Sequence, residues 1–584
     1  MSTIRLFAGR PTPLLGARAD SRRGVIAVLG SLFMCALFAF LALSVDTGRM
    51  VLTQTEMQNA VDAAALAASQ EISLGLGGEG SSFAAAEAAA RTVAAEVAEA
   101  NGVYVNADQD VFFGLRTYNA NSDTWSTQWG VTPFNVVRVV ARRDNKDDLE
   151  AEDGELPLSF GWAVGQESVG LAAEATAFIE SRDLVLVLDF SGSMSDDVEL
   201  RSMNKMGQSA IEDSLDLIWQ QLRDSGATWP DHPGQEKFTD GFGRVDSEYG
   251  TYYNSSKTSK IMNYLNLNDR NSDGSPKYPF PQAGRYSDGT PRDRLSANSS
   301  EDHWEGYVNY VKNLSGAYNR RYGYRTLCDY LLQNNQMKWT NSEDMWRTSH
   351  YPFHAVKEGA TLFLDYLQEM DFGDEVGLVS YGSYAVWEDS HYDGEVDIDI
   401  SDDPITDNLA AINTIQRRHQ AGHYDVYTGM GDGVLKGREM LVGEANDPDD
   451  LGHARNGARP TMIVMTDGQA NRKKSGWSLP GSFKWSDWTD YNGDGSADYS
   501  SGDSYKQYAF WEATEAVKKG ITIHTMAVGA GADTDLMEAI AFAGGGAFVH
   551  VPGGTSVHEM EEELLDAFGT MAAKLPAAQL VSGE

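Results

Sequence analysis

The sequence predicts an α/β protein: a Rossmann-like sheet domain with two large insertions, preceded by a transmembrane helix and a small β-rich domain. Three observations point to this class. An uncharged apolar run extends from Val25 to Val45. Short β-branched and aromatic runs follow between Val103 and Ile179. From Asp183 onward, continuous apolar runs alternate with helical patterns, which is typical of a parallel sheet covered by helices on both faces.

The N-terminal apolar run is long enough to span a membrane. At about 1.5 Å per residue, a helix from Val25 to Val45 crosses a hydrocarbon core of roughly 30 Å. Five arginines and one aspartate precede it, whereas the flank that begins at Asp46 is mixed and slightly acidic. Because basic flanks stay in the cytoplasm, residues 1–24 are predicted to be cytoplasmic and the bulk of the chain periplasmic or extracellular. A cleaved signal peptide is the alternative, but its apolar region normally spans about 7–15 residues.

A helical pattern continues beyond the membrane run, because no proline interrupts Val45–Ser69. Arg22–Gly24, the apolar helix, Val45–Arg49 and Gln58–Ala67 together resemble the TadG-like proteins of Tad/Flp pilus assembly. The resemblance implies a single-pass protein of the bacterial inner membrane with pilus or envelope assembly proteins as partners. The glutamate of a processed pilin helix is absent at Val28–Gly30, so cleavage by a prepilin peptidase is not expected.

A glycine- and serine-rich break at 75–82 separates this helix from a second alanine-rich helix at Phe83–Ala100. Beyond it, Val111–Tyr118 and Phe134–Arg143 are predicted strands separated by polar turns. This small β-rich domain contains no catalytic cluster, and the sequence favours a role in spacing or assembly.

The first buried strand of the larger domain ends in a group of oxygen-bearing side chains. The apolar run Leu184–Leu188 is followed by Asp189, Ser191 and Ser193. The alternation places a carboxylate and two hydroxyls on one turn beyond a strand end, where doubly wound sheets bind ligands. Hard cations such as Mg²⁺ prefer a small shell of oxygen ligands. The sequence therefore predicts a cation site at this strand end.

Two further donors follow later in the chain. Asp467 comes after the strand Met462–Met465, and Thr428 precedes a helical pattern. Together with the first three donors, they resemble the metal-ion-dependent adhesion site of the von Willebrand factor type A family, over about 183–575. In that family these residues surround the metal, and an open coordination position accepts a carboxylate from a partner. The resemblance implies Mg²⁺ (or Mn²⁺) here and a protein ligand that offers a carboxylate.

Taken singly, these five residues also have ordinary structural explanations. A strand end, a helix cap or an Asp-Gly turn accounts for each one. Their joint occurrence in the family's order favours the metal site. Two carboxylates about 4 Å apart at an effective dielectric of 20 also repel by roughly 4 kcal/mol unless a cation lies between them.

The remaining elements fit the same sheet. A helix at His354–Met370 leads into a strand from Glu375, and a helix near Tyr508 leads into a strand from Ile521. The last strand is followed by an acidic helix from Val557. Alternating strands and helices of this kind favour right-handed crossovers in a parallel sheet.

The two insertions, at about 196–350 and 470–505, both leave from carboxyl ends of strands. They are rich in Tyr, Trp, Asn, Gly and Asp, a composition that favours a recognition surface over a core. Each contains an Asp-x-Asn-x-Asp-Gly run, which resembles an EF-hand or dockerin calcium loop. The second insertion supplies loop positions 1, 3, 5 and 9 with Asp490, Asn492, Asp494 and Asp498. In the first insertion, which lacks acids at positions 9 and 12, calcium and a polar turn both stay open for Asp269, Asn271 and Asp273.

The predicted function is binding or adhesion rather than catalysis. Acidic residues outnumber basic ones by 85 to 46, and the net charge of −39 disfavours nucleic acid as a partner. The sequence contains no Gly-x-Ser-x-Gly, His-Glu-x-x-His or Gly-x-x-x-x-Gly-Lys motif. The two cysteines, Cys35 and Cys328, provide no disulfide framework. The alternatives are a structural pilus-assembly component whose metal only stabilises the fold, and a metal-assisted hydrolase with a base in the insertions.

The predicted domains are a basic cytoplasmic N-terminus at 1–24, a transmembrane helix at 25–45, an alanine-rich TadE/TadG-like helical region at 46–101, a small β-rich domain at 102–182, a von Willebrand type A domain with its insertions at 183–575, and a C-terminal tail at 576–584.

Overall fold

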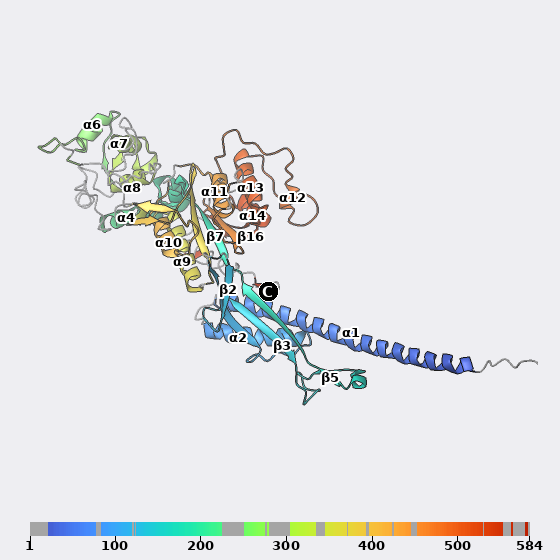
Figure 1. The fold of residues 1–584 in the computed structure, drawn as a ribbon. Helices are drawn as coiled ribbons and strands as arrows, with labels where there is room; N and C mark the ends of the chain where they lie inside the picture. The colour runs from blue at the N-terminus through green and yellow to red at the C-terminus, as the bar shows by residue number, and fades with distance from the viewer. Residues whose placement is uncertain are drawn as a thin grey trace, which may run out of the picture.

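A long helix, a five-stranded sheet and a six-stranded sheet make up the main body of the chain (Figure 1). The computed structural model describes residues 21–76, 83–119, 122, 124–224, 250–274, 277–278, 304–333, 345–370, 372–392, 396–422, 426–444, 452–529, 531–552, 562–563 and 578–581. The basic segment before residue 21 and most of the predicted acidic helix from Val557 lie outside these residues.

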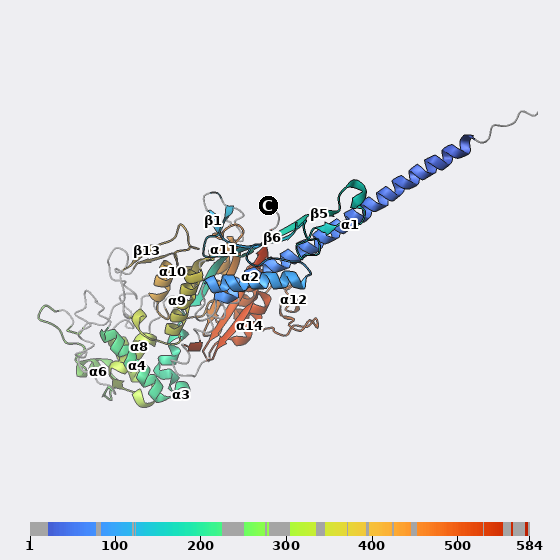
Figure 2. The same ribbon diagram turned by 90° about the horizontal axis from the view of Figure 1, so that it is seen from below.

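Helix α1 (Ser21–Leu76) runs without a break from the apolar segment into the alanine-rich segment. Its N-terminal half projects away from the rest of the chain in both views (Figures 1 and 2), and its large apolar side chains from Ile26 to Val45 are exposed. Among the described residues, α1 is the one helix long and apolar enough to cross a membrane. Its second half buries small side chains between Met57 and Ile72. One half of α1 is therefore suited to lipid and the other packs on protein.

The second half of α1 packs on an antiparallel sheet. The sheet contains, in spatial order, β6 (Leu171–Ile179), β3 (Val136–Arg143), β1 (Val111–Asn119) and β2 (Thr124–Trp129). Alternate side chains such as Val137 and Val139 share one core with α1 and α2 (Phe83–Ala100). The predicted helical region 46–101 and β-rich domain 102–182 thus form a single folded unit.

The C-terminal end of the chain returns to this sheet. Strand β17 (Ala578–Leu580) pairs antiparallel with β6, and Ala578 lies opposite Ile179. Sequence analysis assigned residues 576–584 to a C-terminal tail, and within that segment Ala578–Leu580 pair with the sheet. The physical reason is that β6 would otherwise be an edge strand with unpaired backbone groups, which β17 satisfies on one side.

A short hairpin extends from the connection between β3 and β6. Strands β4 (Leu156–Pro157) and β5 (Ser168–Val169) pair antiparallel, and the 3₁₀ turn η1 (Gly161–Val164) lies between them. Both views place this hairpin beside α1 (Figures 1 and 2).

The six-stranded sheet confirms the predicted fold class. Its spatial order is β11 (Ala385–Trp387), β10 (Glu375–Tyr381), β7 (Arg182–Asp189), β14 (Arg459–Thr466), β15 (Thr522–Val528) and β16 (Gly545–Val551). All neighbours are parallel except the edge pair of β10 and β11. The chain leaves β7 toward β10 and later leaves β14 toward β15, in opposite directions. The carboxyl ends of β7 and β14 therefore form a switch point, where open α/β sheets bind ligands.

Helices cover both faces of this sheet, which explains the unbroken apolar run of β7. Leu186 faces the core shared with α9 (Phe353–Met370) and α10 (Leu409–Arg417). Val187 faces the opposite core, which contains residues of α11 (Met430–Val442), α13 (Ser504–Val517) and α14 (Thr534–Ala543). Small strands β12 (Ser390–Tyr392) and β13 (Asp397–Asp399) form a separate pair after β11.

The described part of the first insertion has a buried aromatic core. The described part of this insertion consists of η2 (Gly192–Val198), η3 (Leu200–Ser202), α3 (Met203–Met206), α4 (Gln208–Asp224), β8 (Thr251–Tyr252), α6 (Thr258–Tyr264), α7 (Trp304–Asn313), η4 (Gly316–Tyr318), β9 (Arg321–Tyr322), α8 (Tyr324–Gln333) and η5 (Met345–Arg347). Tyr307, Tyr322 and Tyr330 are fully buried in it. The prediction that these aromatic residues form a surface rather than a core is therefore wrong. Tyrosine suits a core when its hydroxyl finds a partner, as Tyr307 does with Thr326 Oγ1 at 3.0 Å.

The two folded units meet at the amino ends of the parallel strands. There, Arg455 forms ion pairs with Asp183 and Glu375. Its guanidinium also lies 5.7 Å from the ring of Trp125, whose indole N–H donates to the Asn456 carbonyl at 3.0 Å. Since β7 begins at this junction, its carboxyl end lies at the far side of the domain from the first unit (Figure 1).

Candidate metal centre

Asp189 occupies the carboxyl end of the central strand β7 and is fully buried. One of its carboxylate oxygens accepts the backbone N–H of Ser191 at 2.8 Å, and the other accepts the Thr466 hydroxyl at 2.7 Å. Thr466 ends the neighbouring strand β14. These two hydrogen bonds fix the carboxylate between the two strand ends.

The other predicted donors form a chain of short oxygen–oxygen contacts. Ser191 Oγ lies 3.0 Å from Ser193 Oγ, and Ser193 donates to Asp467 Oδ1 at 2.6 Å. Thr428 Oγ1 lies 3.4 Å from Ser191 Oγ. The three loops after β7, before α11 and after β14 therefore bring all five predicted residues together.

The simpler structural explanations do not account for the three hydroxyls. Ser191 is the residue before η2, but its side chain makes no cap hydrogen bond there. The residue that precedes α11 is Gly429 rather than Thr428. The hydroxyls of Ser191 and Thr428 are instead directed toward each other. Helix capping therefore does not explain the positions of these two hydroxyls.

Gly468 lets the loop after β14 approach this group closely. A Cβ atom at Gly468 would meet Ser193 Oγ at 3.3 Å and Thr428 Oγ1 at 3.5 Å. Beyond it, the Asn471 side chain accepts the Thr428 N–H at 2.7 Å, and the Asn471 N–H donates to the Thr428 carbonyl at 3.1 Å. This paired contact holds Thr428 against the β14 loop, and sequence analysis did not identify Asn471.

Both carboxylates of the group are buried and perturbed. Burial raises the pKa of Asp189 to about 6, even though hydrogen bonds from Ser191 and Thr466 favour the ionised form. Burial, together with the neighbouring Asp189, raises the pKa of Asp467 well above its usual range. Among the described residues, neither carboxylate forms an ion pair with lysine or arginine. Two buried carboxyl groups whose ionised forms lack a basic partner, with hydroxyl neighbours, fit a hard divalent cation that would neutralise them.

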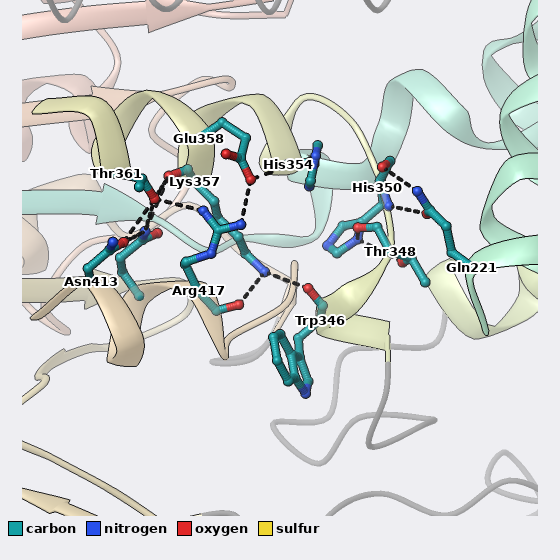
Figure 3. A network of polar contacts seen from close by, with 12 residues as sticks. Gln221, Trp346, Thr348, His350, His354, Lys357, Glu358, Thr361, Asn413 and Arg417 are labelled. Carbon is teal, nitrogen blue, oxygen red and sulfur yellow. Dashed lines mark hydrogen bonds and ion pairs between the residues drawn. The ribbon is translucent and has the colours of Figure 1, made fainter. Parts of the chain in front are cut away.

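A buried lysine supports the loop that passes this group (Figure 3). Lys357 of α9 donates from Nζ to the carbonyls of Arg417 at 2.9 Å and Trp346 at 3.2 Å, and also to the carbonyl of His419. A few residues on, Gly422 N–H donates to the carbonyls of Phe190 and Ser191, at 2.8 and 3.2 Å. Lys357 therefore stabilises the segment whose Gly422 N–H binds the backbone of the Asp189–Ser191 turn.

His350 contacts the same segment, because its Nε2 accepts the Ala421 N–H at 3.4 Å. In Figure 3 it lies on the chain before α9, on the opposite side of His354 from Lys357. Burial lowers the pKa of His350 well below its usual value, with the nearby Lys357 as a further cause. The neutral imidazole is consistent with its accepting a backbone N–H. Sequence analysis did not identify either support residue.

The second predicted metal loop is a turn organised by its own carboxylates. Asp490 accepts the backbone N–H groups of Gly493, Asp494 and Gly495 at 2.7–3.0 Å. Asp498 accepts the N–H of Tyr491 at 2.7 Å and the side-chain amide of Asn492 at 3.2 Å. Within the described residues, no group of three His, Cys, Asp or Glu side chains is placed to hold a metal. Calcium binding by Asp490, Asn492, Asp494 and Asp498 stays a prediction.

Calcium is expected to stabilise the second insertion if these four residues bind it. At a calcium concentration 100 times the dissociation constant, the bound form gains about 2.7 kcal/mol. Limited proteolysis between residues 486 and 503, with calcium or with a chelator, measures this. Asp490→Ala is the test variant, and the exposed Asp399→Ala is a matched control. Equal cleavage with and without calcium in the parent protein would show that the loop is only a turn.

The first predicted loop has a different arrangement. Asp269 forms an ion pair with Lys277 at 3.7 Å, and its carbonyl accepts the Lys277 N–H at 2.9 Å. Gly274 N–H donates to the Asn271 carbonyl at 3.0 Å, which closes an Asp-Gly turn. These contacts favour the polar turn for Asp269, Asn271 and Asp273.

The doubly wound sheet confirms the predicted α/β fold class, and the five predicted donors lie together at its switch point. At the N-terminus, residues 24–71 match the family described as "Putative Flp pilus-assembly TadE/G-like". This match covers the exposed half of α1 and much of its packed half. No curated protein matches the chain.

Several solved structures are similar to part of the chain at low identity. One is an aerotolerance-related membrane protein from Bacteroides fragilis (13% identity, TM-score 0.23), with 38% of this chain and 90% of that chain covered. Another is the pilus adhesin SpaC from Lactobacillus rhamnosus GG (16%, TM-score 0.23; 39% and 28% covered). A third is a von Willebrand factor type A protein from Catenulispora acidiphila (16%, TM-score 0.23; 38% and 38% covered).

Proposed function

We propose that this chain is a membrane-anchored, extracytoplasmic binding protein of a Tad/Flp-type pilus or envelope assembly, and that it binds a protein ligand through a divalent cation. The observation that carries the proposal is the assembly of five oxygen donors from three loops. They lie at the switch point of the sheet and include two buried carboxylates. The match of residues 24–71 to a pilus-assembly family supports the cellular setting.

The donor set favours Mg²⁺, or Mn²⁺, over softer metals. It contains only oxygen, with two carboxylates and three hydroxyls, and no thiolate or imidazole. A cation bound there would supply positive charge to which a carboxylate of the ligand can coordinate. The protein's part is to hold Asp189, Asp467 and the hydroxyls in place and to exclude water from the buried side of the group.

The position of the site suits a ligand outside the membrane. The first folded unit holds the sheet by the amino ends of its strands, through Arg455, Trp125 and the β6–β7 connection. The donor group lies at the opposite ends of the same strands. If α1 spans the bilayer, the site is presented away from the membrane surface.

Capture of the native ligand tests this function. The full chain, immobilised with Mg²⁺, is expected to retain a specific protein from an envelope extract, and a chelator should release it. Asp189→Asn should retain at least tenfold less, because one ligand of the cation is lost. Asp399→Asn, at an exposed carboxylate outside both insertions, serves as the control and should capture as the parent does.

Two results would contradict the proposal. Capture that persists in chelator would show that no cation takes part. If a chelator lowers the thermal stability of the protein but does not lower capture, the metal only stabilises the fold, as expected for a purely structural component.

The membrane topology gives a separate prediction. With the N-terminus in the cytoplasm, protease added to intact spheroplasts is expected to digest the von Willebrand type A domain and to spare an N-terminal fragment. Immunoblotting against tags at the two termini measures this, and permeabilised cells provide the control. Full protection of the domain in intact spheroplasts would contradict the proposed orientation.

A further inference from the structure

The tip of the β4–β5 hairpin exposes two aromatic side chains. Phe160 is 42% exposed and Trp162 is 70% exposed. They lie in the run Leu158–Gly165, which is apolar apart from Ser159 and has the acids Glu155 and Glu167 on either side. An apolar tip of this size, with acidic residues on either side in the sequence, is typical of a segment that inserts only to a shallow depth.

This tip is fixed to α1 rather than free. The N–H groups of Ser159 and Phe160 donate to the two carboxylate oxygens of Asp46, at 2.8 and 2.9 Å. One turn further along α1, Arg49 donates to Ser159 Oγ at 2.8 Å. Asp46 is only 6% exposed, so the two hydrogen bonds that it accepts are partly shielded from water. They also give a structural role to two members of the Val45–Arg49 motif.

The attachment to Asp46 determines how far the tip lies from the apolar run of α1. Asp46 directly follows Val45, the last residue of the uncharged apolar run. The tip's backbone therefore lies within hydrogen-bond distance of the first charged side chain beyond that run. Figures 1 and 2 both show the hairpin beside α1, with its turn against the middle of the helix. If the bilayer surrounds Val25–Val45, the tip lies at the membrane surface.

We propose that the hairpin tip is a second membrane contact, in which Phe160 and Trp162 sit in the interfacial layer of the bilayer that α1 crosses. Tryptophan favours that layer because its ring is apolar and its N–H can stay hydrated. Together, the helix and the tip fix the tilt of the whole extracytoplasmic part relative to the membrane. This inference rests on the proposed membrane span.

The experiment places a fluorophore on the tip in the full chain. Trp162→Cys is made with Cys35→Ser, labelled with a nitrobenzoxadiazole dye and reconstituted, one chain per disc, in phosphatidylcholine nanodiscs. Cys328 is fully buried, so native labelling leaves it untouched, and a Cys35→Ser parent verifies this. Lipids with a nitroxide near the head group, or deep in the acyl chain, quench the dye according to its depth.

Two labelled controls make the result specific. Phe38→Cys lies within the apolar run, and Tyr252→Cys is an exposed aromatic position in the first insertion, 55% exposed. The dye at position 162 is expected to be quenched by the shallow nitroxide at least threefold more than the dye at 252. The dye at 38 should respond most to the deep nitroxide.

The outcomes separate the two levels of the proposal. If position 38 is quenched while position 162 matches 252, the helix spans the bilayer and the tip inference is wrong. If neither 38 nor 162 is quenched, the span itself is wrong. A blue-shifted dye at 162 without lipid quenching would show that protein covers the tip, which also overturns the inference.

Discussion

Asp189→Asn is expected to abolish the stabilisation of the protein by Mg²⁺. In the parent, Mg²⁺ at 100 times its dissociation constant should add about 2.7 kcal/mol to the free energy of unfolding. For a domain that spans about 183–575, that corresponds to a rise in Tm of about 3 °C. Asparagine has nearly the same shape and can still bond to Ser191 N–H and the Thr466 hydroxyl, but it lacks the charge that holds the cation.

The metal-free variant should be at least as stable as the metal-free parent. In the parent, Asp189 and Asp467 are both buried, and the charge of Asp189 disfavours ionisation of Asp467. Asparagine removes that repulsion while it keeps the packing. Thermal unfolding of both proteins, with Mg²⁺ and with chelator, gives the four values needed. An equal rise in Tm for parent and variant would mean that Mg²⁺ binds elsewhere.

The central sheet was predictable because a strand that is buried on both faces has a continuous run of apolar residues. The run before Asp189 has no polar residue for five positions, and the structure places Leu186 and Val187 in opposite cores. The donor group was predictable for a related reason. Its residues directly follow strands or precede a helix, so their chain positions alone place them at one edge of the sheet.

Features that depend on distant backbone were not predictable. Strand β17 has three residues, too few for any periodicity, and forms only because β6 offers an unpaired edge. Tyrosine composition could not distinguish a surface from a core in the first insertion. The choice depends on hydroxyl partners such as Thr326 for Tyr307, which only the fold supplies. Asp46 and Arg49 were noted as part of a motif, but their contacts lie more than a hundred residues away.

Lys357 was missed for the same reason. Its side chain lies on the buried face of α9, next to Ala355, Val356 and Ala360. Its partners are backbone carbonyls, at Arg417 and His419 among others, and a carbonyl acceptor leaves no trace in a sequence. A lysine on the apolar side of a predicted helix was the one available signal.

Lys357→Met is expected to weaken Mg²⁺ binding roughly tenfold, the scale on which support residues affect a metal site. Methionine fills a similar volume but leaves the carbonyls of Trp346, Arg417 and His419 without their donor. The segment that ends at Gly422 then loses its anchor behind Ser191. Titration with Mn²⁺, followed by electron paramagnetic resonance, measures the affinity. Hydrogen exchange at 417–422 should rise in parallel, while exchange in β15 stays unchanged.

The same variant should also change how stability depends on pH, and this separates loss of the buried amino group from a general loss of packing. Burial lowers the pKa of Lys357 well below 10.5, with Arg417 as a further cause. Between the lowered pKa and 10.5, unfolding takes up a proton, so the free energy of unfolding rises with pH. The slope approaches about 1.4 kcal/mol per pH unit for a single group.

Denaturant unfolding between pH 6 and 10 should show this rise in the parent and a smaller one in Lys357→Met. Lys518→Met, at a half-exposed surface position, is the matched control and should retain the parent's slope. Identical slopes in the parent and Lys357→Met would show that the fold does not lower the pKa of Lys357.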